Sequence, residues 1–103
     1  MKAILMTVAA AGSLMLAAQA NANEALAQKS GCLACHSVSQ KVLGPAYKDI
    51  AAKYKGDKGA EAKLIDKVKK GGSGVWGPIP MPAMSPQVKD DDIKTLVQWI
   101  LKL

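Results

Sequence analysis

The stretch GCLACHSVSQ, residues 31–40, holds both cysteines of the chain and its only histidine within five consecutive positions. Cys32 and Cys35 are separated by two residues, and His36 follows directly. A structural zinc site would need four ligands, and no other cysteine or histidine completes the set. A disulfide across two residues would close too small a loop to stabilise much. A thioredoxin-like dithiol, which would need a strand-helix-strand context that the sequence does not show, stays open as the main alternative to the interpretation that follows.

The same C-x-x-C-H spacing is the pattern of covalent c-type haem attachment. Two thiols about one helical turn apart can reach the two vinyl groups on one edge of a porphyrin, and the next residue then directs its imidazole at the iron. We therefore predict one haem c, attached through Cys32 and Cys35 and ligated by His36. The composition agrees, because the chain has no Phe, two Trp and two Tyr. A small domain with so few large side chains needs a cofactor or a metal to complete its core.

The N-terminus has the pattern of an export signal. Lys2 gives a positive start, residues 3–18 form an uncharged and mostly apolar run, and Ala-Asn-Ala at 20–22 supplies a cleavage site. A retained membrane anchor is the alternative, but this run falls short of the roughly 20 residues that a spanning helix needs. We predict a cleaved signal peptide over residues 1–22 and a single exported haem-binding domain over residues 23–103.

All positive charge of the predicted mature chain comes from lysine. Residues 23–103 contain thirteen lysines and eight acidic residues, which is a formal charge of +5. Nucleic-acid-binding proteins usually place arginines at phosphates and bases, whereas these lysines are spread along the whole chain. We therefore predict no nucleic-acid partner and expect most lysines on solvated helix faces. A positive surface also allows docking to an acidic protein partner.

Hydrophobic periodicity predicts helices and no convincing strand, so the expected fold class is all-α. Four helices are expected, over about residues 23–29, 45–54 and 60–70, and after residues 90–92. The second helix has a proline near its start, and a glycine follows both the second and the third helix. This arrangement is typical of helix ends. The last helix is preceded by three aspartates, which suit the positive end of a helix, and carries an apolar stripe that we expect to face inward.

The segment GGSGVWGPIPMPAMSPQV, residues 71–88, contains four Gly and four Pro and predicts a loop. Long loops in small domains are usually disordered or functional, and this one is too apolar for a disordered linker. It holds both methionines of the predicted mature chain, Met81 and Met84. Prolines at 78, 80 and 82 stiffen the backbone around Met81. We predict that Met81 rather than Met84 is the second axial ligand, with ordinary loop packing as the alternative for either.

Four stretches, GCLACH, VLGPAYKDIAAKY, KVKKGGSGVWGPIPMP and WILKL, resemble the small class I cytochromes c of bacteria, which are short periplasmic electron carriers. The resemblance covers essentially all of residues 23–103. It implies the cytochrome c fold, in which about four helices wrap around one covalently bound haem and the N- and C-terminal helices cross.

The resemblance also implies roles for individual residues. Both cysteines would form thioether bonds, and His36 and Met81 would be the axial ligands of the iron. Trp76 would donate its indole N–H to a haem propionate. The Pro45 carbonyl would accept a hydrogen bond from the second ring nitrogen of His36, which fixes the tautomer of an iron ligand. Where many relatives have an arginine near the propionates, this chain has Lys67.

These observations together predict a monomeric periplasmic cytochrome c that carries single electrons between larger redox proteins. The resemblance implies a respiratory-chain donor and a terminal oxidase, nitrite reductase or peroxidase as acceptor. With both axial positions filled by side chains, the iron changes oxidation state without binding a substrate, so we expect no enzymatic activity. We also expect no permanent membrane anchor. The alternatives are a haem enzyme or gas sensor with a sixth position that opens, and a haem subunit permanently docked in a complex.

Overall fold

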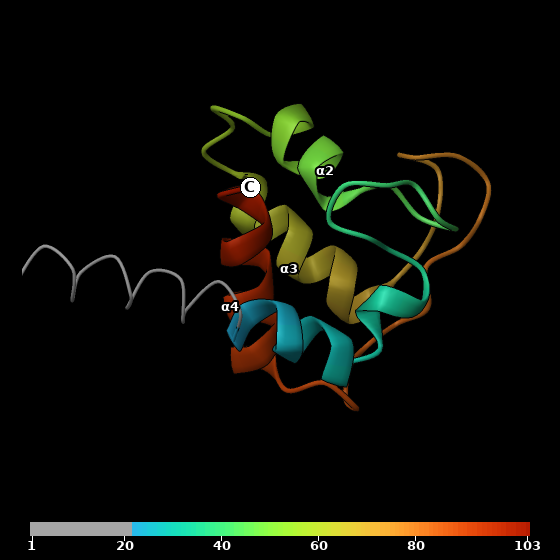
Figure 1. The fold of residues 1–103 in the computed structure, drawn as a ribbon, viewed down its shortest axis with the longest axis vertical. Helices are drawn as coiled ribbons and strands as arrows, with labels where there is room; N and C mark the ends of the chain where they lie inside the picture. Colours follow the sequence, from blue (N-terminus) through green and yellow to red (C-terminus); the bar gives the residue numbers. More distant parts are fainter. Residues whose placement is uncertain (1–21) are drawn as a thin grey trace, which may run out of the picture.

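The computed structural model describes residues 22–103, whose path is shown in Figure 1. An N-terminal helix over residues 22–29 is followed by the 3₁₀ turn η1 (Cys32–Ala34) and by α2 (Tyr47–Lys53), α3 (Ala60–Lys70) and α4 (Asp90–Leu101). No β-strand occurs within residues 22–103, which confirms the all-α prediction. None of the helices in this range is both long and apolar enough to span a bilayer. The predicted signal peptide lies outside the described residues except for residue 22.

The helix ends have local causes. The first turn of α4 contains Asp90, Asp91 and Asp92, whose charges face the positive end of the helix dipole. The last turn of α3 contains three lysines, which suit the negative end. α3 stops where Gly71 adopts a φ of 72°, a conformation that costs little only for glycine. α2 starts after Ala46, whose backbone is still extended.

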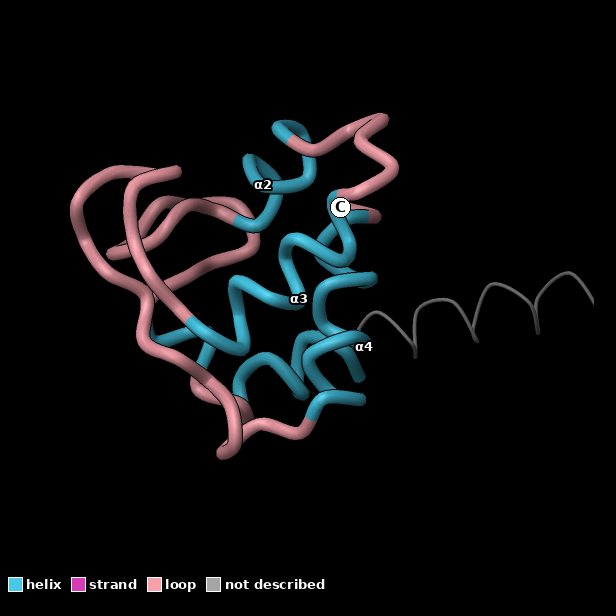
Figure 2. The backbone as a smooth tube through the Cα atoms, turned by 180° about the vertical axis from the view of Figure 1, so that it is seen from behind, coloured by secondary structure: helices cyan, strands magenta, loops and turns pink. Residues whose placement is uncertain are grey.

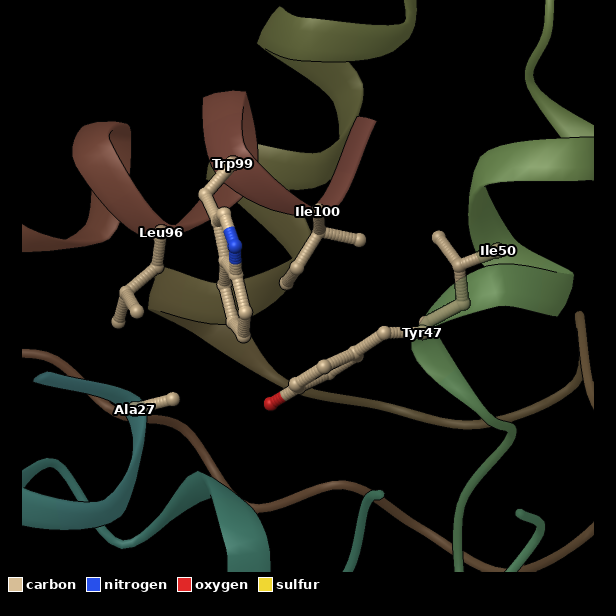
Figure 3. Packing of buried hydrophobic residues seen from close by; sticks show 6 residues of the cluster. All are labelled: Ala27, Tyr47, Ile50, Leu96, Trp99 and Ile100. Atoms are coloured by element: carbon tan, nitrogen blue, oxygen red, sulfur yellow. The ribbon is translucent and has the colours of Figure 1, made fainter. Parts of the chain in front are cut away.

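A first core cluster joins the N-terminal helix, α2 and α4 (Figure 3). Its buried members are Ala27, Tyr47, Ile50, Leu96, Trp99 and Ile100. Ala27 is fully buried, and its small side chain lets the N-terminal helix lie directly across α4 (Figure 1). The expected crossing of the two terminal helices is therefore present.

A second cluster lies between α3 and α4, which run side by side in Figures 1 and 2. Ile93 and Val97 are its most deeply buried side chains, and Val88 packs with them. Half-buried apolar residues of α3 close the cluster from the other side. At the edges of this helix pair, Gln98 Nε2 donates to Glu61 Oε1 at 2.8 Å. α4 is thus shared by both clusters and organises the whole fold.

Residues 71–88 form a loop without helix, as predicted, and Figure 2 shows it leaving α3 and returning to α4. Backbone contacts join the two arms of this loop and tie it to the end of α3. Gly72 and Met81 form an antiparallel bridge in which each N–H donates to the other carbonyl, both at 2.9 Å. Further along, the N–H of Met84 donates to Val68 O at 3.0 Å. The loop is therefore an ordered part of the fold.

Candidate functional site

One largely apolar cleft gathers every residue predicted for the site. Its lining includes Cys32, Cys35, His36, Pro45, Trp76 and Met81. These residues come from two segments far apart in the sequence, one around η1 and one in the long loop. Side chains of α3 and α4, such as Leu64 and Leu96, form the inner wall. The fold thus brings the predicted residues together although the sequence separates them.

The turn η1 places the two thiols and the imidazole on one wall of the cleft. Gly31, at a φ of 81°, leads the chain out of the N-terminal helix into this turn. The N–H groups of Cys35 and His36 both donate to Cys32 O, at 3.3 and 3.0 Å. Both cysteines are half-buried free thiols. Burial raises the pKa of the Cys32 thiol, and a hydrogen bond with Tyr47 works against this rise.

The imidazole of His36 is surrounded by the segment that follows it. Its Nδ1 lies 2.8 Å from the Pro45 carbonyl oxygen, the contact that the resemblance implied. A carbonyl only accepts hydrogen bonds, so Nδ1 carries the proton and the neutral ring leaves Nε2 free to bind a metal. A Cβ on Gly44 would lie only 2.5 Å from His36 Cε1, so this position has room for glycine alone. The ring of Tyr47 stacks on the imidazole, with centroids 5.1 Å apart.

The two methionines of the long loop lie in different surroundings. Met81 lines the cleft, and its backbone is held by the bridge to Gly72. Met84 is absent from the cleft lining and packs against the second core cluster of Val88, Ile93 and Val97. A bystander role for Met84 therefore agrees with its position.

Trp76 and Lys67 lie at different places along the cleft. Trp76 is 42% exposed, and the ammonium of Lys53 lies 5.7 Å from the centroid of its ring. Lys67 lines the cleft with its ammonium beside the loop, 3.1 Å from the point that a Cβ on Gly72 would occupy. The lining of the cleft therefore includes both an indole and a positive charge.

The chemistry of the cleft fits haem c. Leu43, Val75 and Ile79 line it, yet they are 55%, 54% and 58% exposed. Apolar side chains gathered around one cleft indicate a site that an apolar partner or ligand covers. The donor set consists of two thiols and an imidazole from one segment and a thioether from another, which is the chemistry of haem attachment and ligation.

The sequence alone did not identify Gly44 as a residue of the site, and it did not predict which residue Gly72 pairs with. Gly44 directly precedes Pro45 in VLGPAY, and a Gly-Pro pair so soon after the C-x-x-C-H motif is a signal that could have drawn attention to it. Gly72 belongs to the run of glycines at 71–74, whose pattern predicts a helix stop and a close approach of the backbone to the haem. Its pairing with Met81 depends on the path of the loop, which no local pattern encodes.

Comparisons with known proteins show which family the chain resembles over its length. A family model described as cytochrome c matches residues 20–103. Cytochrome c-552 of Nitrosomonas europaea is 50% identical over 103 residues, which cover 100% of this chain and 99% of that protein. Cytochrome c-551 of Pseudomonas aeruginosa is 48% identical over 98 residues, which cover 94% of this chain and 92% of that protein.

Solved structures give the same result for the fold. The crystal structure of wild-type cytochrome c552 from Nitrosomonas europaea matches with a TM-score of 0.74 and 54% identity, over 78% of this chain and 98% of that chain. The class 1 cytochrome MtoD from Sideroxydans lithotrophicus matches with a TM-score of 0.68 and 35% identity, over 80% of this chain and 92% of that chain.

Proposed function

Because the chain belongs to the cytochrome c family, we propose that it carries single electrons between larger redox proteins of the periplasm. Membership of this family gives the chain covalently bound haem c and a part in electron transfer. Our proposal adds the two iron ligands, the compartment and the class of partner.

One observation supports the ligand pair above all others: His36 and Met81 line the same cleft from two separate segments. Cys32 and Cys35 line it beside His36 and would form the thioether bonds. The proton of His36 is held on Nδ1 by Pro45, so Nε2 is available for the iron. Haem c, once bound, supplies an iron that takes up and gives back one electron.

This ligand pair favours an electron carrier over an enzyme or a gas sensor. With His36 and Met81 bound, no coordination position is left open for a substrate. A thioether ligand also stabilises the reduced iron and raises the reduction potential. The bridge to Gly72 holds the backbone of Met81, so less conformational freedom is lost when its sulfur binds.

Two further residues would support the cofactor. Trp76, half-exposed at the cleft, would donate its indole N–H to a haem propionate. Lys67 would place a positive charge near the same groups, which favours the ionised propionate.

The charge and the N-terminus support the class of partner and the compartment. Thirteen lysines against eight acidic residues over positions 23–103 favour redox partners with acidic docking surfaces. The pattern of residues 1–22 favours export and cleavage, which would release the domain into the periplasm without a permanent anchor. We propose that it acts there as a monomer.

Substitution of the two methionines tests the ligand assignment. Met81→Ala should abolish the weak near-infrared sulfur-to-iron band of the oxidised protein, lower the reduction potential and open the iron to external ligands. Met84→Ala is the matched control and should leave all three nearly unchanged. The double variant prevents Met84 from replacing the lost ligand. If Met84→Ala alone removed the band, the assignment would have to be reversed.

Carbon monoxide separates the carrier from the enzyme or sensor. The reduced wild-type protein should bind it little at neutral pH, because Met81 occupies the sixth position. A rapid and complete spectral change would instead indicate that this position opens.

A further inference from the structure

We propose that Tyr47 is a positioning residue that sets the rotational orientation of the His36 imidazole. This inference rests on the proposed ligation of the iron by His36. The Tyr47 and His36 rings are stacked, with centroids 5.1 Å apart and planes inclined by 23°. Tyr47 is only 3% exposed, so this contact lies inside the core.

The orientation of Tyr47 is itself fixed from two sides. Trp99 of α4 meets its ring edge to face, with centroids 5.7 Å apart and planes at 76° (Figure 3). The backbone N–H of Tyr47 donates to Ser37 O at 2.9 Å, and the next N–H along the chain donates to Val38 O at 3.0 Å. The first turn of α2 is thereby tied to the two residues that follow His36. The Tyr47 ring is therefore held in one orientation, and the imidazole stacks against it.

The imidazole needs this stacking contact because its other contacts leave a rotation open. The torsion about the bond from Cβ to the ring of a histidine has broad minima. The hydrogen bond from Nδ1 to Pro45 selects the tautomer and holds one ring atom, but the ring can still swing about the line between these two atoms. A stacked ring restricts this swing, and the backbone of Gly44 limits the space near Cε1. Gly44, Pro45 and Tyr47 lie within four consecutive residues. One short segment therefore sets the position, the tautomer and the plane of the His36 imidazole.

Ordinary core packing would give Tyr47 the same burial, so the test must measure ligand orientation as well as stability. The plane of the axial imidazole, together with the orientation of the methionine sulfur, determines how unpaired spin is spread over the haem of the oxidised protein. This spread is read from the pattern of haem methyl resonances in paramagnetic NMR and from the g-values in electron paramagnetic resonance. Neither pattern changes when a distant core residue is made smaller.

The experiment uses the haem-loaded protein and three variants. Tyr47→Phe keeps the stacked ring and loses the hydroxyl beside Cys32, and it should keep the wild-type methyl pattern. Tyr47→Leu removes the ring and should change the order or the spread of the methyl resonances and the g-values. Ile93→Ala is the control, because this fully buried residue belongs to the other core cluster and does not line the cleft. It should lower the melting temperature without changing either spectrum.

The outcomes separate this inference from the proposed function. A wild-type protein without the sulfur-to-iron band would overturn the ligand pair itself. A wild-type protein with the band and a Tyr47→Leu variant with an unchanged methyl pattern would overturn only the role of Tyr47. If Tyr47→Leu does not fold, Trp99→Leu decides, because it removes the edge-to-face support of the Tyr47 ring while Gly44 and Pro45 still contact the imidazole. A changed pattern in Trp99→Leu supports the role, and an unchanged one refutes it.

Discussion

Replacement of Gly44 by alanine should destabilise the haem-loaded protein, because the new methyl group would collide with the proposed iron ligand. The added Cβ would lie 2.5 Å from His36 Cε1 and 2.8 Å from Nδ1. Both distances are below any normal contact, and the imidazole is held in place and cannot easily move away. Gly44 does not have a positive φ, so its backbone accepts alanine and the cost is purely steric.

The size of the effect follows from three contributions. Overpacking of a well-packed site costs about 1–3 kcal/mol. Movement of the ring also weakens the 2.8 Å hydrogen bond to Pro45, at about 1 kcal/mol. Alanine also leaves the unfolded chain with less backbone freedom than glycine does, which offsets about 0.4–1 kcal/mol of these costs. We expect the free energy of unfolding to fall by about 1–3 kcal/mol.

Gly59→Ala is the matched control for this substitution. Gly59 also has a negative φ, −91°, and its Cβ would come no closer than 3.5 Å to another atom. Alanine is a weaker N-cap for α3 than glycine, but it also restricts the unfolded chain, and these two effects on stability have opposite signs. The free energy of unfolding of Gly59→Ala should therefore stay within about 1 kcal/mol of wild type. Guanidinium unfolding followed by circular dichroism and haem absorbance measures both variants. Equal midpoints, together with an unchanged sulfur-to-iron band, would refute the packing of His36 against Gly44.

Haem removal, pH and salt should each act in a definite direction. The double variant Cys32→Ala, Cys35→Ala should be largely unfolded by circular dichroism, since the haem completes the core; a cooperative transition with native helix content would contradict this. The pKa of Asp57 is lowered mainly by a hydrogen bond from the Gly59 N–H and, to a smaller extent, by a hydrogen bond from Lys63. Its contribution to stability is present above the pKa of the unfolded chain and is lost as pH falls through the lower folded value. Asp57→Asn should therefore lower the melting temperature slightly at about pH 7 and not at about pH 2. An equal fall in melting temperature at both pH values would count against a lowered pKa of Asp57. Electron-transfer rates with an acidic partner should fall as ionic strength rises, because salt screens the attraction between the lysines and the partner. Rates that do not change with ionic strength would indicate that the lysines serve solubility only.

The helices were predictable where periodicity and stop signals coincide. α3 runs from Ala60 to Lys70, as predicted, because an apolar stripe ends at a glycine. α2 starts at Tyr47, two residues later than expected, because Ala46 is extended and precedes the first helical turn. The turn η1 is three residues long and too short to show any periodicity.

Candidate site residues are easier to predict from the sequence than the contacts that they make. C-x-x-C-H and a proline-flanked methionine are rare patterns with specific chemistry, so they indicate a cofactor directly. The approach of Gly44 to His36 and the pairing of Gly72 with Met81 depend on the path of the short loop between the two partners, which no local pattern encodes. Tyr47 has the pattern of an ordinary core residue, and only its orientation in the structure indicates a second role.

The bridge between Gly72 and Met81 makes the proposed sulfur ligand part of a separate structural unit. Two backbone hydrogen bonds close residues 72–81 into a ring, whereas the helices are held by two buried clusters to which none of these residues contributes a buried member. Segments held by few contacts open locally at a lower free energy than the global fold. If Met81 binds the iron as proposed, its sulfur can leave the iron when this ring opens while the helices stay folded. Redox potential and helix stability would then be separable, and evolution or design could adjust them through different residues.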